Sequence, residues 1–207
     1  QLLVLLNSKL GPIRFEDAGE VVVNSDQGDY GLTLFRKDAF AAMVEVRHTH
    51  RLEAQDAVVL LTSRCDEKNY FAYGEPAGKG PGHHCIMVSG WEDMVAVDFL
   101  YPTLHIVASN LLLGCMHGTM EEWELNAHEE PVGCISDFCG NKQDILLRLR
   151  TADVCEACAG KYNAAIEAGE FSVEEFEQCM ELLELAREGI RFHNRMIATP
   201  KPSPLLI

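Results

Sequence analysis

Two close pairs of cysteines in the second half of the chain constrain its structure more than any other feature. Four residues separate Cys134 from Cys139, two separate Cys155 from Cys158, and fifteen lie between the pairs. Each pair can supply two sulfur ligands to one tetrahedral zinc ion, and binding then closes the intervening segment into a loop. We therefore predict one structural zinc per chain, bound by Cys134, Cys139, Cys155 and Cys158. Because protein side chains fill all four positions, this zinc has no open position for catalysis.

Other interpretations of these cysteines remain open. The four can be ordinary buried thiols, Cys155 and Cys158 can form a redox pair, and an iron–sulfur cluster takes the same number of ligands. The other cysteines of the eight in the chain are scattered, at Cys65, Cys85, Cys115 and Cys179. Disulfide frameworks are typical of short secreted chains. We therefore expect a reduced protein in the cytoplasm.

The charge balance of the chain is acidic. Its 207 residues include 17 basic and 32 acidic ones, which gives a formal charge of −15. This charge disfavours nucleic acid and anionic membranes, and no apolar run reaches the length of about 20 residues that spans a bilayer. We therefore expect a protein partner, although acidity can also serve solubility alone. Because the sequence starts at Gln1, we expect the native protein to start further upstream.

The hydrophobic pattern predicts an α+β fold. We expect strands at residues 1–6, 19–24, 56–63, 69–73 and 84–89. We expect helices at residues 37–48, 103–115, 144–149, 156–168 and 172–196, with a loop at 119–133. The helix that follows Pro102 is apolar enough to be buried on most sides, and proline suits a first helical turn. The last helix begins at Ser172 with Glu175 three residues later, which is the pattern of a capping box.

Several segments carry a family resemblance through their order along the chain. The sequence reads VVLLTSR at 58–64, NYFAYGE at 69–75 and CIMVSG at 85–90, before the helix after Pro102 and the two cysteine pairs. This order resembles that of archaemetzincins, which are zinc peptidases of the zincin-like fold. The resemblance covers about residues 56–160 and implies a zincin-like mixed sheet with a buried helix and a four-cysteine zinc segment.

The resemblance also implies a domain organisation. Residues 1–160 would form the zincin-like domain, with the zinc segment at 134–158. Residues 161–207 would form a C-terminal helical extension with a proline-rich tail. The amphipathic helix of this extension can pack on the core of the same chain or dock a partner.

The catalytic motif of that family, HExxHxxGxxH, is absent. The helix at 104–114 reads LHIVASNLLLG, so it offers His105 but has Ile106 in place of the glutamate and Ser109 in place of the second histidine. Gly133 stands before Cys134, where the family has its third histidine. If the motif is instead aligned by counting back from the cysteines, its HExxH part falls on residues 123–127. The residues at its three defined positions are then Trp123, Glu124 and Ala127, and only the glutamate agrees with the motif. The resemblance therefore implies a degenerate zincin that keeps the structural zinc and lacks the catalytic one.

These observations favour a non-catalytic interaction or regulatory module stabilised by zinc. The first alternative is a metal-dependent hydrolase with a non-standard site built from His48, His50, His83, His84 or His105, to which His117 and His128 can also contribute. A weaker alternative is a nucleic-acid-associated zinc module with a small basic patch at Lys142, Arg148 and Arg150.

Overall fold

A three-stranded mixed sheet lies at the centre of the computed structural model, which describes residues 1–23, 32–75, 82–91, 94–95, 98–116 and 120–198. Its strand order is β2 (Val58–Thr62), β5 (His83–Met87) and β4 (Ala72–Glu75). β5 runs parallel to β2 and antiparallel to β4. Two short parallel strands, β1 (Thr33–Leu34) and β3 (Cys65–Asp66), form a separate pair. The predicted α+β class is confirmed.

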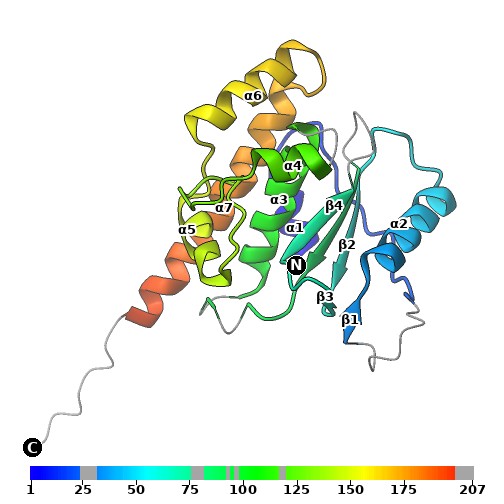
Figure 1. Ribbon diagram of the computed structural model, residues 1–207, viewed down its shortest axis with the longest axis horizontal. Helices are drawn as coiled ribbons and strands as arrows, with labels where there is room; N and C mark the ends of the chain where they lie inside the picture. The colour runs from blue at the N-terminus through cyan, green and yellow to red at the C-terminus, as the bar shows by residue number, and fades with distance from the viewer. Residues whose placement is uncertain (24–31, 76–81, 92–93, 96–97, 117–119, 199–207) are drawn as a thin grey trace, which may run out of the picture.

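Helices cover both faces of the sheet (Figure 1). α2 (Arg36–His50) packs on one face, and α3 (Leu100–Met116) packs on the other. α7 (Val173–Ala198) lies on the far side of α3 from the sheet. The shorter helices are α1 (Leu2–Leu6), α4 (Met120–Asn126), the 3-10 helix η1 (Lys142–Asp144), α5 (Ile145–Thr151) and α6 (Glu156–Glu167).

β5 is buried along its whole length and separates two hydrophobic cores. Because successive side chains of a strand point to opposite faces, Cys85 and Met87 join the core under α2, whereas Ile86 joins the core around α3. His83 accordingly meets Arg47 of α2, and His84 stacks on Trp123 of α4. The two adjacent histidines therefore lie on opposite faces of the sheet.

α3 is the most buried helix among those described, as its apolar sequence predicts. Pro102 lies in its first turn, where a missing N–H costs no hydrogen bond. α7 begins with the predicted capping box, because Ser172 Oγ accepts the N–H of Glu175 at 3.1 Å and the Glu175 carboxylate accepts the N–H of Ser172 at 2.8 Å. The predicted domain boundary at residue 160 falls within α6, and buried residues from both sides of it share the core around α3.

Some sequence-based expectations were wrong. Residues 1–6 form a helix instead of a strand, and Leu6 is buried in the core around α3. Residues 19–23 form no regular element, and residue 24 lies outside the described residues. The expected loop at 119–133 contains α4, whose Met, Glu and Leu residues are good helix formers. The proline-rich tail at 199–207 also lies outside the described residues.

The strand predicted at 69–73 is displaced to Ala72–Glu75 by a turn around Asp66. One oxygen of this carboxylate accepts the backbone N–H groups of Lys68 at 2.9 Å and Tyr70 at 3.2 Å. Asn69 between them has a φ of 60°, in the left-handed region that asparagine tolerates. This local hydrogen bonding competes with strand pairing until Ala72.

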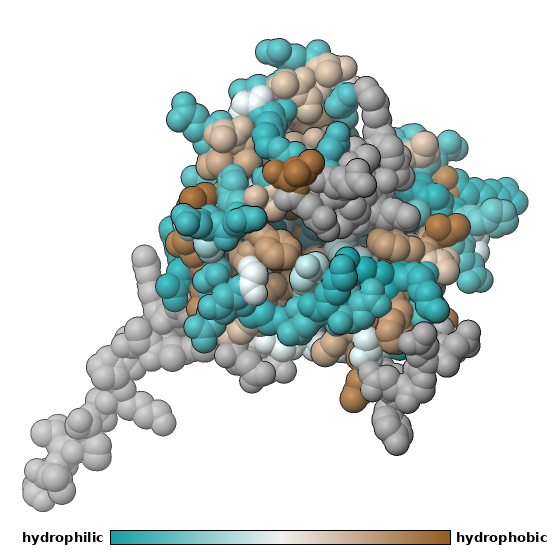
Figure 2. All heavy atoms as spheres, viewed as in Figure 1, coloured by the Kyte–Doolittle hydropathy of each residue, from teal (hydrophilic) through white to brown (hydrophobic). Residues whose placement is uncertain are grey.

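The face of the molecule shown in Figure 2 is mainly hydrophilic. On the face shown in Figure 2, apolar side chains form small separate groups among polar ones. Within the described residues, no helix combines the length and the apolar character needed to cross a membrane.

Candidate metal centre

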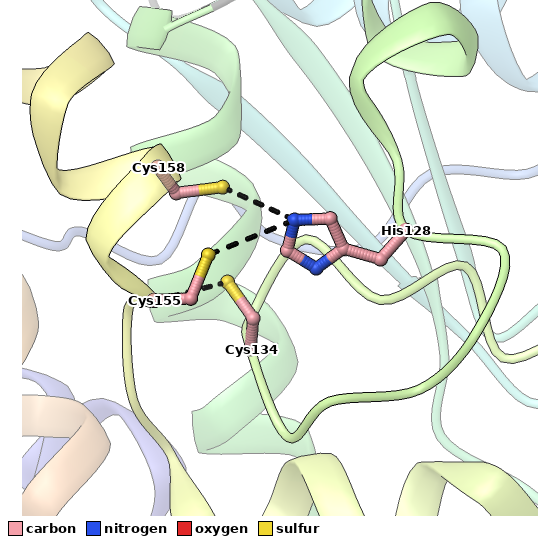
Figure 3. A group of neighbouring side chains, drawn as sticks. All are labelled: His128, Cys134, Cys155 and Cys158. Atoms are coloured by element: carbon pink, nitrogen blue, oxygen red, sulfur yellow. Dashed lines mark hydrogen bonds between the residues drawn. The ribbon is translucent and has the colours of Figure 1, made fainter.

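Four side chains from a loop and a helix terminus converge on one point: His128, Cys134, Cys155 and Cys158 (Figure 3). Their ligand atoms all lie within 4.8 Å of one another. His128 Nε2 is 3.7 Å from Cys155 Sγ and 3.6 Å from Cys158 Sγ. In a zinc tetrahedron with ordinary Zn–S and Zn–N bond lengths, nitrogen and sulfur ligands lie about 3.6 Å apart. The cluster therefore has the dimensions of a tetrahedral site.

The start of α6 positions two of the sulfurs. Cys155 is the N-cap residue of this helix, and Cys158 lies one turn further on. Residues three apart on a helix share one face, so both thiols point the same way. This geometry explains why a two-residue spacing supplies two ligands to one ion, as the sequence predicts.

A tight turn positions the third sulfur. Cys134 C=O accepts the N–H of Asp137 at 3.0 Å, and Cys134 Sγ receives the N–H groups of Ser136 at 3.5 Å and Cys155 at 3.4 Å. These two donors hold the sulfur in place. Gly133 precedes the turn with a φ of 86°, and a Cβ there would lie 2.7 Å from the side chain of Thr151. The turn therefore requires glycine at position 133.

A carboxylate holds His128 in place. His128 Nδ1 lies 2.9 Å from Asp137 Oδ1, and the other oxygen of Asp137 accepts the N–H groups of Val132 at 3.0 Å and Gly133 at 2.7 Å. A carboxylate can only accept here, so the proton of the imidazole belongs on Nδ1. Nε2 then directs its lone pair at the sulfurs. Histidines that bind metals commonly have such a second partner.

Cys139 does not belong to this group, in contrast to the predicted four-cysteine set. Its thiol donates to the carbonyl of Asp137 at 3.6 Å and lies near the buried Arg148. Burial raises the pKa of the Cys139 thiol to about 11, and the nearby Arg148 charge only partly offsets this. His128 is the fourth member of the cluster instead. The group that could hold a metal ion is therefore His128, Cys134, Cys155 and Cys158.

The surroundings shift the pKa values of two thiols of the cluster in opposite directions. Burial raises the pKa of the Cys158 thiol to about 12, although its hydrogen bond with Ser136 lowers it in part. Burial also acts to raise the pKa of Cys155, but hydrogen bonds from Cys158 and Cys134 outweigh it and lower that pKa. A bound divalent cation deprotonates a coordinating thiol outright, so the cluster would bind as three thiolates and one neutral imidazole.

The donor set fits zinc. Three soft sulfur ligands with one imidazole form a common structural zinc site, and the protein fills all four positions. All eight cysteines of the chain are free thiols, so no disulfide competes for the ligands.

The other histidines do not converge. His48 and His50 are exposed at the end of α2, and residues two apart on a helix do not share a face. His83 and His84 point to opposite sides of the sheet, and His117 lies outside the described residues. Within the part of the chain that the structure describes, the histidines, cysteines and carboxylates form no second group with metal-ligand geometry.

His105 is fully buried in α3, and neither of its ring nitrogens has a hydrogen-bond partner among the described residues. Burial, and then the charge of Arg148, hold the pKa of His105 well below its usual value. One turn further on, Ser109 Oγ accepts from Arg148 Nη2 at 2.7 Å, while Arg148 Nη1 donates to the Asp137 carbonyl at 3.2 Å. From inside the core, Arg148 therefore connects Ser109 of α3 to the loop that contains Asp137.

The chain matches no protein family, no curated protein and no solved structure. Its function must accordingly be argued from its own residues.

Proposed function

We propose that this chain is a non-catalytic interaction or regulatory module, derived from a metallopeptidase-like fold and stabilised by one structural zinc ion. The observation that carries the proposal is the closed ligand set at His128, Cys134, Cys155 and Cys158. A catalytic zinc needs an open position for water or substrate, and this set leaves none.

The surroundings of α3 support the same role. This helix lies beside the sheet, where the resemblance to archaemetzincins would place catalytic histidines. His105 is buried there, and its ring nitrogens have no partner among the described residues. Ser109 takes up a hydrogen bond from Arg148 instead of binding a metal. No observation favours the hydrolase alternative.

The basic patch gives little support to a nucleic-acid role. Arg148 is buried within the core, and Lys142 donates to Asn69 Oδ1 at 2.7 Å and lies over the Phe71 ring at 5.0 Å. Only Arg150 of the three is exposed. A formal charge of −15 also opposes phosphate binding.

Metal counting on purified variants tests the proposal. We expect one zinc per chain in the parent protein and in Cys139→Ser, because Cys139 lies outside the cluster. The double change Cys155→Ser with Cys158→Ser should remove it. X-ray absorption should show three sulfur ligands at about 2.3 Å and one nitrogen at about 2.0–2.1 Å.

Two results would contradict the proposal. The first is a second metal ion that survives the double cysteine change. The second is peptidase activity that His105→Ala abolishes, since an active peptidase would need catalytic chemistry at α3.

A further inference from the structure

β2 leaves one edge of the central sheet open. On the side that faces β5, Val58 donates its N–H to the carbonyl of Gly82 at 3.1 Å. On the same side, the carbonyl of Thr62 accepts the N–H of Val88 at 2.8 Å. Because backbone direction alternates along a strand, Val59 and Leu61 direct their N–H and C=O groups away from β5. In the part of the chain that the structure describes, no segment bonds to these outward groups.

A groove of about 1290 Å³ runs along this open edge. One side is lined by Ala57 and by β2 as far as Leu61, and another by the segment at residues 12–21. The buried side chain of Gln178 anchors that segment, since it accepts the N–H of Ile13 at 2.8 Å and donates to its carbonyl at 2.9 Å. Pockets for small molecules usually measure about 300–1000 Å³, so the groove has room for a length of chain.

Both helical layers line the groove with apolar side chains. Met43 and Val46 come from α2 on one face of the sheet, and Val107 and Leu111 come from α3 on the other. An extended segment beside β2 would therefore be covered on both of its faces. Strands covered on both faces are apolar at nearly every position. A segment that binds in the groove should therefore also be apolar at nearly every position.

Acidic residues line the groove together with the apolar ones. Seven carboxylates and one arginine line it. Three of the carboxylates belong to the segment at residues 12–21 and one precedes β2: Glu16, Asp17, Glu20 and Asp56. Electrostatic complementarity selects partners of opposite charge, so a segment with lysine or arginine at its ends matches this lining.

We propose that the groove receives an extended segment of a partner protein, with about five apolar residues, the length of β2, flanked by basic residues. The segment adds to the sheet as a new strand beside β2. Outward N–H and C=O groups of Val59 and Leu61 supply up to about four backbone hydrogen bonds to it. This inference rests on the proposed interaction role, but its evidence is the β2 edge and not the metal centre.

A peptide set tests the groove directly. The probes have the form Lys-Lys-X5-Lys-Lys, where X is Val, Ile, Leu or Phe, and binding to the zinc-loaded chain is followed by fluorescence anisotropy. Members of the set should bind and slow the amide exchange of Val59 and Leu61 at least about tenfold, because new hydrogen bonds protect those groups. Probes with glutamate in place of lysine should bind at least about tenfold more weakly.

Two matched changes separate strand addition from simple hydrophobic contact. Leu61→Pro removes one outward N–H while the bonds from β2 to β5 remain, and it should weaken binding at least about tenfold. Leu61→Ala keeps that N–H and should have a smaller effect. N-methylation of alternate peptide amides removes the complementary bonds, from the peptide N–H groups to the outward carbonyls of Val59 and Leu61, without altering the protein. It should also abolish binding.

Four results would overturn the inference. They are failure of every lysine-flanked peptide to bind, equal binding of the N-methylated peptide, protection of Val59 and Leu61 in the free monomer, and protection of the same amides in a dimer. Protection in the monomer would show that the chain covers its own edge, and protection in the dimer would make a second copy the occupant. Zinc content measured on the same samples distinguishes failure of this inference from failure of the proposed zinc-stabilised module. If no peptide binds to a chain that holds one zinc ion, only the inference about the groove is refuted.

Discussion

At the scale of single residues, Asp137 connects the metal centre to its surrounding loop. Its two carboxylate oxygens hold His128 Nδ1 and the backbone N–H groups of Val132 and Gly133. In Asp137→Asn, the amide oxygen can keep the backbone bonds while its NH2 group faces Nδ1. The imidazole proton then moves to Nε2, the atom that faces the sulfurs. We expect zinc affinity to fall about 10–100-fold, as measured by competition with a coloured chelator.

Glu129→Gln is the control for this change, because Glu129 is an exposed neighbour of His128. It removes the same charge without touching the imidazole and should leave zinc affinity unchanged. Equal affinity for the Asp137→Asn protein and the parent would show that the carboxylate does not orient the ligand.

The buried His105 predicts a specific dependence of stability on pH. Its pKa lies well below the usual value in the folded chain because of burial and then the Arg148 charge, whereas the unfolded chain binds a proton with a pKa of about 6.5. Below that pH the unfolded state takes up a proton that the folded state excludes. The free energy of unfolding therefore falls on acidification, by up to about 1.4 kcal/mol per pH unit from this group.

His105→Leu should remove this contribution. Because the ring nitrogens have no partner among the described residues, leucine loses no hydrogen bond there. Denaturant unfolding at pH 7.5 and pH 5.5 should show that the variant gains on the parent as the pH falls. His48→Gln, at an exposed histidine, should follow the parent at both values. A gap between His105→Leu and the parent that stays constant with pH would contradict the assignment.

The metal ligands show how far single residues could be predicted. Cys134, Cys155 and Cys158 follow from their spacing, because a turn and the start of a helix bring close pairs together. His128 could not be chosen from spacing, since it reaches the cluster only through backbone bonds of 3.0 Å to Ser136 and Phe138 that bring its loop back. The position of Cys139 outside the cluster could not be predicted either, because its φ of 52° and its contact with Arg148 are tertiary features.

At the scale of secondary elements, two helical glycines in different surroundings give opposite predictions. A Cβ on Gly160 of α6 would meet nothing within 4 Å, whereas a Cβ on Gly189 of α7 would lie 2.2 Å from the Tyr101 ring of α3. Gly160→Ala should raise the free energy of unfolding by about 0.5–1 kcal/mol, the gain in helix propensity. Gly189→Ala should lower it by about 1–3 kcal/mol, because overpacking forces α3 and α7 apart.

Chemical denaturation of the two variants checks this pair, and each serves as the control for the other. Stabilisation by both would show that Tyr101 moves aside easily. Destabilisation by both would show that α6 needs glycine for a reason other than space.

The elements with strong local signals were predicted well. The capping box of α7 and the proline at the start of α3 rest on contacts within a few residues. β2 was predicted from its apolar run, which fits a strand paired inside a sheet. The strand expected at 1–6 failed because a run of leucines and valine fits a buried helix as well as a strand. Packing of Leu2, Leu5 and Leu6 against the core around α3 decides between them.

At the scale of the whole molecule, two separate cores lie on opposite faces of the sheet. The core under α2 includes Leu34, Met43 and Val58, whereas the core around α3 and α7 includes Cys134 and Cys158. Two of the metal ligands therefore belong to the larger core. Zinc binding at the cluster should stabilise that core as a unit, while the core under α2 has no direct contact with the metal ligands.

Stability should consequently depend on the concentration of free zinc. A ligand that binds only the folded state adds about 2.7 kcal/mol to the free energy of unfolding at 100 times its Kd and about 4.1 kcal/mol at 1000 times. Buffered zinc solutions should therefore raise the Tm of the parent chain and of Cys139→Ser. The Tm of the double variant Cys155→Ser with Cys158→Ser should not respond, and an equal response there would place the stabilising zinc elsewhere.

Hydrogen exchange after chelation of zinc can show which parts of the chain the bound zinc stabilises. Without zinc, four ligands from a loop and a helix start lose their common partner, and the thiols of Cys134 and Cys158 remain in an apolar core. We expect fast exchange in α5 and α6 and in the parts of α3 and α7 that pack on them. α2 and the β2 amides that face β5 should stay protected, because Met43 and Val58 keep their own core. Uniform loss of protection across both cores would instead show that the sheet transmits the loss of zinc to the whole fold.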